Sequence, residues 1–238
     1  MSTKLIQALV VSASLLFASA AAWNARAQDA KASYATMAPV DRYLSADRDA
    51  EIALAKSAAP PGISGGAEIL MLGKDGYTTA IAGKNGFTCL VERAWMSPID
   101  SPEFWNPRMR GPICYNPAAT RTILPYTILR TKLVLSGLSK AQMVESVKAA
   151  LASNELKQPE AGAMSYMLSK DGYLGDEVKH WHPHLMFYAP TTDAASWGAN
   201  LPGSPVLLND AYPQGPEPET VFLVPLGTWS DGTPAHSN

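Results

Sequence analysis

Residues 67–93 read AEILMLGKDGYTTAIAGKNGFTCLVER, and this stretch decides the expected fold class. Three apolar runs lie within it, at residues 67–72, 77–82 and 87–93. The dipeptides Asp75-Gly76 and Asn85-Gly86 separate the runs. Both favour type I′ turns, because Asp, Asn and especially Gly tolerate the positive φ that such turns need. The sequence therefore predicts three antiparallel strands joined by two hairpin turns.

A second stretch echoes the first. Residues 66–77 read GAEILMLGKDGY and residues 162–173 read GAMSYMLSKDGY, with 8 of 12 positions identical. One interpretation is two similar β-units, in which the strand at Phe87 would correspond to the strand after Pro183. The other is that two unrelated hairpins share the same turn chemistry.

Further helices and strands are predicted along the rest of the chain. Ser139 and Gln142 form a capping box, which begins a helix over 139–152, and Gly137 suits the end of the preceding helix. The other expected elements are helices at 41–56 and 118–135, the latter broken near Pro125, and strands at 163–168, 184–188 and 220–225.

Residues 94–117 contain five prolines together with aromatic residues. So many prolines predict neither a central strand nor a long helix. The charged residues around this segment, Glu92 and Arg93 among them, are expected to form solvated pairs. Together these patterns predict an α+β fold, with an antiparallel β-sheet and the helices packed on one face.

The N-terminus has the pattern of a secretory signal. Lys4 precedes an apolar run over 5–22, and Ala25-Arg26-Ala27 matches a signal peptidase site. We expect a signal peptide over 1–27, a flexible segment over 28–38 and a single α+β domain over 39–238. A retained helical anchor is the alternative. No second apolar run is long enough to span a bilayer, so we expect a soluble periplasmic or secreted protein.

Charge and cysteine content narrow the expected partners. The net charge is −2 and no basic stripe is present, so nucleic acid is not an expected partner. The two cysteines, Cys89 and Cys114, are expected to form a disulfide in an oxidising compartment. Two free thiols are the alternative, although the C-x-x-C spacing of redox couples is absent.

Three of the four histidines lie together, at His180, His182 and His184. In extended backbone these alternate residues point to one side, so their imidazoles could bind zinc or copper. Asp176 and Glu177 could add a further ligand or orient the rings. In the alternative interpretation the rings bond to nearby carbonyl groups and Trp181 covers the core.

We therefore expect an exported soluble protein that binds a metal ion or small ligand through the His-x-His-x-His segment, with Trp105 and Trp181 as ligand-binding residues. A metal-free hydrolase or transferase with a histidine general base is an alternative, although the sequence identifies no catalytic residues. A third hypothesis is an interaction module whose Trp- and Pro-rich loop contacts an envelope component.

The metal hypothesis predicts that the purified mature protein carries close to one zinc or copper ion per chain. Replacing all three histidines of the segment by Ala should remove the ion, because the soft nitrogen ligands are lost. Elemental analysis, paired with melting curves with and without added metal, measures this. A metal-free protein whose melting temperature ignores added zinc and copper would contradict the hypothesis.

Overall fold

The computed structural model describes residues 34–176, 179–190, 192–209 and 219–235. The chain divides into two units, and the fold below is that of the unit Met37–Asn238. The expected signal peptide over 1–27 lies outside the described residues and stays a prediction. None of the described helices is both long and apolar enough to cross a membrane.

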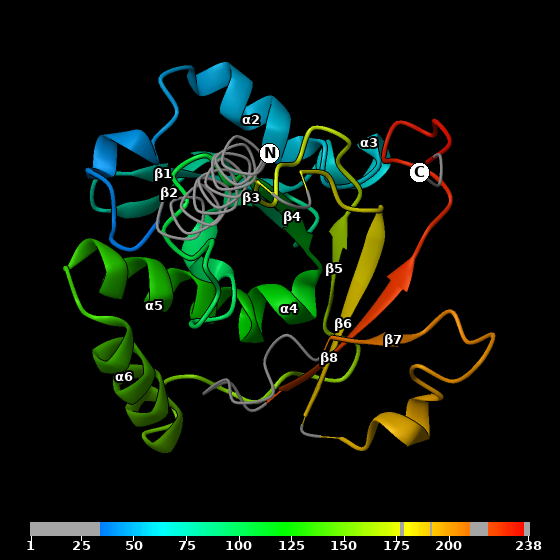
Figure 1. Ribbon diagram of the computed structural model, residues 1–238. Helices are drawn as coiled ribbons and strands as arrows, with labels where there is room; N and C mark the ends of the chain where they lie inside the picture. Colours follow the sequence, from blue (N-terminus) through cyan, green and yellow to red (C-terminus); the bar gives the residue numbers. More distant parts are fainter. Residues whose placement is uncertain (1–33, 177–178, 191, 210–218, 236–238) are drawn as a thin grey trace, which may run out of the picture. The chain divides into compact units, whose positions relative to one another are not determined.

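The described strands form one sheet (Figure 1). Its strands are β1 (Glu68–Gly73), β2 (Gly76–Ile81), β3 (Thr88–Glu92), β4 (Gly111–Tyr115), β5 (Met164–Met167), β6 (His184–Pro190), β7 (Leu207–Leu208) and β8 (Glu219–Pro225). Their order across the sheet is β2-β1-β3-β4-β5-β6-β8-β7. All neighbouring strands are antiparallel except β1 and β3, which are parallel. The predicted α+β class with a mainly antiparallel sheet is confirmed.

The helices begin and end largely where local signals place them. They are α2 (Arg48–Lys56), α3 (Pro61–Ser64), α4 (Pro117–Thr122), α5 (Leu124–Leu135) and α6 (Lys140–Ala152), with short 3-10 helices η1 (Val40–Arg42), η2 (Ala94–Met96) and η3 (Ala194–Trp197). The capping box of Ser139 and Gln142 at the start of α6 is confirmed. The helix α2 begins later than predicted, because the side chain of Asp47 accepts hydrogen bonds from Asp49 and Ala50 and caps it there.

Helices cover both faces of the sheet, so the expectation that they pack on one face is wrong. On the first face, Leu90 and Ile113 share a core with Ile123 and Leu124, from the segment of α4 and α5. On the other face, Cys89, Val91 and Cys114 pack against Ile52 and Ala55 of α2. Successive residues of β3 and β4 alternate between these two cores, as the pleat of a strand requires.

The second predicted hairpin does not form. Asp75-Gly76 joins β1 and β2 as expected, with Gly76 at a φ of 120°. After β2, however, the chain crosses to the other side of β1, where β3 pairs parallel to it. Asn85 does not form the predicted hairpin turn. Its Nδ2 donates to the carbonyl oxygen of Ile63, and its Oδ1 accepts from the amide of Phe87. These contacts tie the turn to α3 instead of to a hairpin partner.

The Pro-rich segment contains a central strand, contrary to the prediction. The strand β4 is buried throughout and lies between β3 and β5. The amide of Arg110 donates to Tyr173 on the β5 side. Because backbone amides alternate along a strand, the nitrogen of Pro112 faces this same side, where β5 pairs only with Cys114 and Tyr115. The missing N–H of Pro112 therefore breaks no ladder bond.

The two echoing stretches form different structures. The strands β1 and β5 begin 96 residues apart, and so do β3 and β6. However, β1 pairs with β3 in parallel, whereas β5 and β6 pair antiparallel. The second Asp-Gly dipeptide forms no hairpin. A side chain at Gly172 would place its Cβ 3.1 Å from the ring of Trp181, so this glycine permits close packing instead of a tight turn. The similarity is therefore local and does not extend to two equivalent β-units.

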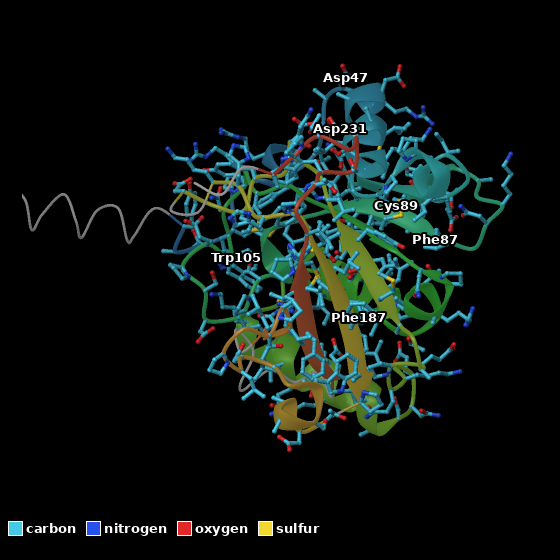
Figure 2. The ribbon with its side chains drawn as sticks, turned by 90° about the vertical axis from the view of Figure 1, so that its right-hand side faces the viewer. Asp47, Phe87, Cys89, Trp105, Phe187 and Asp231 are labelled. Carbon is cyan, nitrogen blue, oxygen red and sulfur yellow. A yellow bond between two sulfur atoms is a disulfide. The ribbon has the colours of Figure 1, made fainter. Side chains whose placement is uncertain are left out.

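Cys89 and Cys114 form the predicted disulfide (Figure 2). The two residues are direct partners across the antiparallel pair of β3 and β4. The bond thus links β3 to β4, the strand within the Pro-rich segment. Such a loop closure contributes about 3 kcal/mol to stability, chiefly by restricting the unfolded chain.

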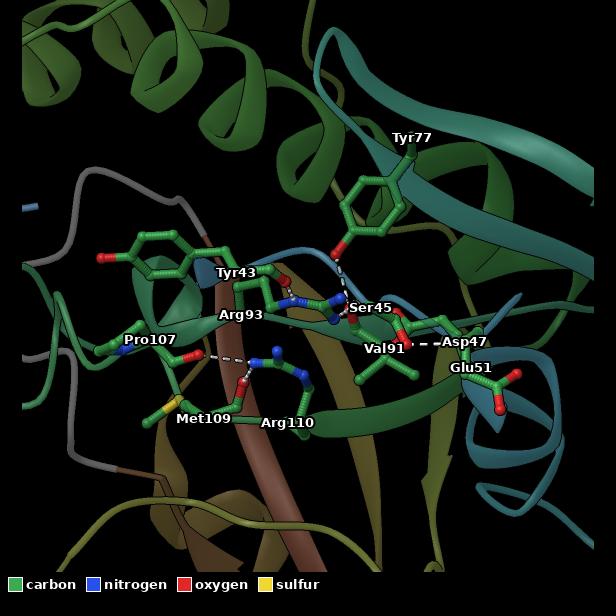
Figure 3. A network of polar contacts seen from close by, with 10 residues as sticks. All are labelled: Tyr43, Ser45, Asp47, Glu51, Tyr77, Val91, Arg93, Pro107, Met109 and Arg110. Atoms are coloured by element: carbon green, nitrogen blue, oxygen red, sulfur yellow. Dashed lines mark hydrogen bonds and ion pairs between the residues drawn. The ribbon is translucent and has the colours of Figure 1, made fainter. Parts of the chain in front are cut away.

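A buried ion pair joins the end of β3 to α2 (Figure 3). The guanidinium of Arg93 is fully buried, and its Nη2 lies 2.7 Å from Oε1 of Glu51, which is 3% exposed. The same guanidinium donates to the carbonyl oxygens of Tyr43 and Val91. The expectation that Arg93 forms a solvated pair is therefore wrong, because the contacts that desolvate it come from segments distant in sequence.

We predict that Glu51→Gln lowers the free energy of unfolding by about 3 kcal/mol, because it leaves a buried guanidinium without its counter-charge. The matched control is Asp49→Asn in the same helix. Asp49 is exposed, so this change should cost less than about 1 kcal/mol. Urea unfolding of both variants measures the difference. Equal losses of unfolding free energy in the two variants would show that the buried ion pair stabilises the fold no more than the exposed Asp49 does.

Candidate ligand-binding cavity

A cavity of about 1010 Å³ lies on the sheet face that α4 and α5 share. Its floor is formed by residues of β3, β4, β5, β6 and β8, and its walls include α5 and the segment from Met96 to Glu103. The helices α4 and α5 pack mainly over β2, β4 and β5. The cavity continues beyond them across β6 and β8, so the helices of the described residues fill only part of this face.

Apolar and aromatic side chains make up most of the lining. Representative residues are Met109, Ile113, Met167, Trp181, Met186 and Leu223. Alternation along β8 brings Val221, Leu223 and Pro225 to the cavity. Cavities that bind small molecules usually combine such a lining with a few polar groups.

One polar cluster lies at the end of β3. The hydroxyl of Tyr115, on β4, donates to Oε1 of Glu92 at 2.6 Å, and the hydroxyl of Thr127, on α5, donates to the same oxygen at 3.2 Å. Burial raises the pKa of Glu92, although both hydroxyls and the positive charge of Arg130 oppose the shift. Burial, reinforced by the nearby Glu92, raises the pKa of Tyr115 well above its usual value.

The histidine segment forms another part of the cavity lining. His180, Trp181, His182 and His184 all line it. His180 and His182 are exposed, whereas His184 is partly buried and lies edge-on to the ring of Trp181. The three rings thus differ in their surroundings, although the backbone spacing is the predicted one.

The environment of His184 sets its protonation. Its Nδ1 lies 2.7 Å from the carbonyl oxygen of His182 and donates to it, which leaves Nε2 as an acceptor in the neutral ring. Burial lowers the pKa of His184, and the bond to this carbonyl only partly opposes the shift. The ring is therefore neutral around pH 7.

The structure brings together only part of the predicted metal set. Asp176 lies in an ion pair with Arg108 and also accepts from the hydroxyl of Tyr173. Glu177 lies outside the described residues. Among the described residues, no three His, Cys, Asp or Glu side chains are grouped so that they could hold a metal ion. Zinc or copper binding stays a prediction for elemental analysis.

The two tryptophans predicted to bind ligand occupy different places. Trp181 is 9% exposed, lines the cavity and donates from Nε1 to the carbonyl oxygen of Ser169. Trp105 is equally buried but is not among the described residues that line the cavity. Its ring packs edge-on against Phe104. The structure therefore brings Trp181 but not Trp105 to the histidine segment.

Sequence reasoning missed the cluster of Glu92, Tyr115, Thr127 and Arg130. These residues come from two strands and one helix, and they are neighbours only because β3, β4 and α5 pack together. One signal was available, because Glu92 follows Leu90 at the spacing that places both on the same face of a strand. An acidic residue on a core-facing position is a reason to look for partners.

Comparison with known proteins returned no matching family model, no matching curated protein and no matching solved structure.

The lowered pKa of His184 predicts a pH dependence of stability. At a pH below about 6.5 the unfolded chain binds more protons at this residue than the folded protein. The free energy of unfolding should therefore fall as the pH is lowered through about 6.5, and this contribution should level off below the folded pKa. Urea unfolding at about pH 7.5 and pH 5 should show a smaller loss for His184→Gln than for the wild type.

His180→Gln is the matched control for this measurement. It retains His184, so its loss between the two pH values should follow the wild type. Comparing variants also removes the contribution of Glu92, whose raised pKa changes stability in the opposite direction. Identical pH profiles for the wild type and His184→Gln would refute the assignment.

Proposed function

We propose that the protein binds a small, mainly apolar molecule in the cavity, with the segment from His180 to His184 forming one wall. This retains the small-ligand form of the hypothesis drawn from the sequence. The cavity volume of about 1010 Å³ carries the proposal, because it lies at the upper end of the range for small-molecule sites. The mainly apolar lining favours a ligand that buries apolar surface.

The methionines of the lining support an adaptable site. Met96, Met109, Met167 and Met186 contribute to it from four different segments. Unbranched thioether side chains adjust to irregular shapes at low cost, so they suit ligands that differ in chain length or branching. The flat ring of Trp181 would offer a face for stacking.

We further propose that this binding takes place in the periplasm or outside the cell. The predicted signal over 1–27 supports export, and the disulfide between Cys89 and Cys114 is compatible with an oxidising compartment. The ligand or an envelope component that carries it would then be encountered there.

Binding of the neutral fluorescent probe N-phenyl-1-naphthylamine tests the proposal. We expect saturable binding with a micromolar Kd, since the probe is apolar and small compared with the cavity. Leu223→Trp should weaken binding at least about tenfold, because the larger ring fills cavity space that the probe needs. The increase in probe fluorescence measures the affinity.

Val224→Trp is the matched control. It adds the same ring to the next residue of β8, which points to the opposite side of the strand and does not line the cavity. Its affinity for the probe should stay close to that of the wild type. Absence of saturable binding, or equal weakening in both variants, would reject this cavity as the binding site.

A further inference from the structure

Glu92 has one oxygen occupied and one available. Tyr115 and Thr127 both donate to Oε1, and their own hydroxyl oxygens lie 3.0 Å apart, so both donors gather at the same oxygen of Glu92. Within the described part of the chain, Oε2 accepts no hydrogen bond. Because Glu92 lines the cavity and is only partly covered, this oxygen is accessible to a bound molecule.

The cluster lies where an apolar ligand would place a polar end. Ile113 on β4 and Tyr126 on α5 line the cavity beside it, and the other face of β3 is filled by Val91 and the core against α2. The raised pKa of Glu92 indicates that the groups around its carboxylate do not fully replace the solvation that water would give. A ligand group that donates to Oε2 would supply part of that missing solvation.

The charge of the cluster disfavours an ionic ligand. Arg130 is 3% exposed, donates from Nη2 to the carbonyl oxygen of Ser97 and acts electrostatically on Glu92. A ligand carboxylate would place a second anion beside Glu92. The positive charge of Arg130 already acts on Glu92, so an ammonium group would gain less there than beside a carboxylate with no cation nearby. Either would also have to lose its own hydration in a largely apolar cavity.

We propose that Glu92, held by Tyr115 and Thr127, is the head-group subsite of the cavity and selects a neutral hydrogen-bond donor on an apolar ligand, namely an alcohol or amide. This inference rests on the proposed ligand-binding function and names the class of ligand. Glu92 acts as a specificity-determining residue, and the apolar lining supplies most of the affinity.

Displacement of N-phenyl-1-naphthylamine by matched ligands at pH 8 tests the subsite. Dodecan-1-ol can donate to Oε2, whereas its methyl ether, 1-methoxydodecane, has nearly the same apolar surface and cannot donate. We expect the alcohol to bind at least about tenfold more tightly than the ether, the usual effect of one hydrogen bond to a charged group. Dodecanoate and dodecylammonium should both bind more weakly than the alcohol.

Glu92→Gln assigns the preference to this residue. Its amide oxygen takes the place of Oε1 beside the hydroxyl of Tyr115, so the NH₂ group faces the cavity and donates to alcohol and ether alike. The tenfold preference should fall to about one. Glu103→Gln is the control, because Glu103 also lines the cavity but its carboxylate is bonded to Asn106 and to the amide of Asp176. This variant should keep the preference.

The outcomes separate the two proposals. If the wild type binds the probe but does not distinguish alcohol from ether, or prefers either ionic ligand, the subsite is wrong and the binding function stands. If the probe does not bind, the function itself is wrong. The comparison of alcohol and ether in the wild type needs no variant. It therefore decides the question even if the melting curve of Glu92→Gln shows that this variant folds poorly.

Discussion

The buried guanidinium of Arg93 ties together three segments of the chain. It donates to the carbonyl oxygen of Tyr43 ahead of α2, to the carbonyl oxygen of Val91 on β3 and to the carboxylate of Glu51 on α2. A charge removed from water so completely is tolerated only when each donor has a partner. The position of the N-terminal helix on the sheet and the conformation at the end of β3 are therefore coupled.

This coupling also orients the residue before it. Successive side chains of a strand point to opposite faces, so holding Arg93 against α2 directs Glu92 toward the cavity. The ion pair of Arg93 and the polar cluster of Glu92 thus depend on the same stretch of backbone. Arg93, the ion-pair partner of Glu51, also lines the cavity, so changes at Glu51 bear on the neighbouring residue that we assign to the head group.

The cavity itself follows from incomplete coverage of the sheet. The helices α4 and α5 fill one part of their face with Ile123 and Leu124, while the same face extends across β6 and β8. The cross-strand disulfide and the tolerated position of Pro112 keep β3 and β4 paired beneath this region. A paired sheet whose end is left open by the described helices is a suitable scaffold for a binding site.

Features that depend on neighbouring residues could be predicted from the sequence alone. The capping box at Ser139, the turn at Gly76, the disulfide and most strand positions depend on local backbone preferences or on a single possible pairing. For the candidate site, the sequence predicted the histidine segment and Trp181, both of which line the cavity.

Only the tertiary structure decided the crossing of β3 beside β1, the central position of β4, the burial of Arg93 and the cluster around Glu92. Each of these depends on desolvation and hydrogen bonding between residues that are far apart in the chain. Local turn and proline signals cannot report such contacts, because the same dipeptide or side chain has a different lowest-energy state once another segment packs against it.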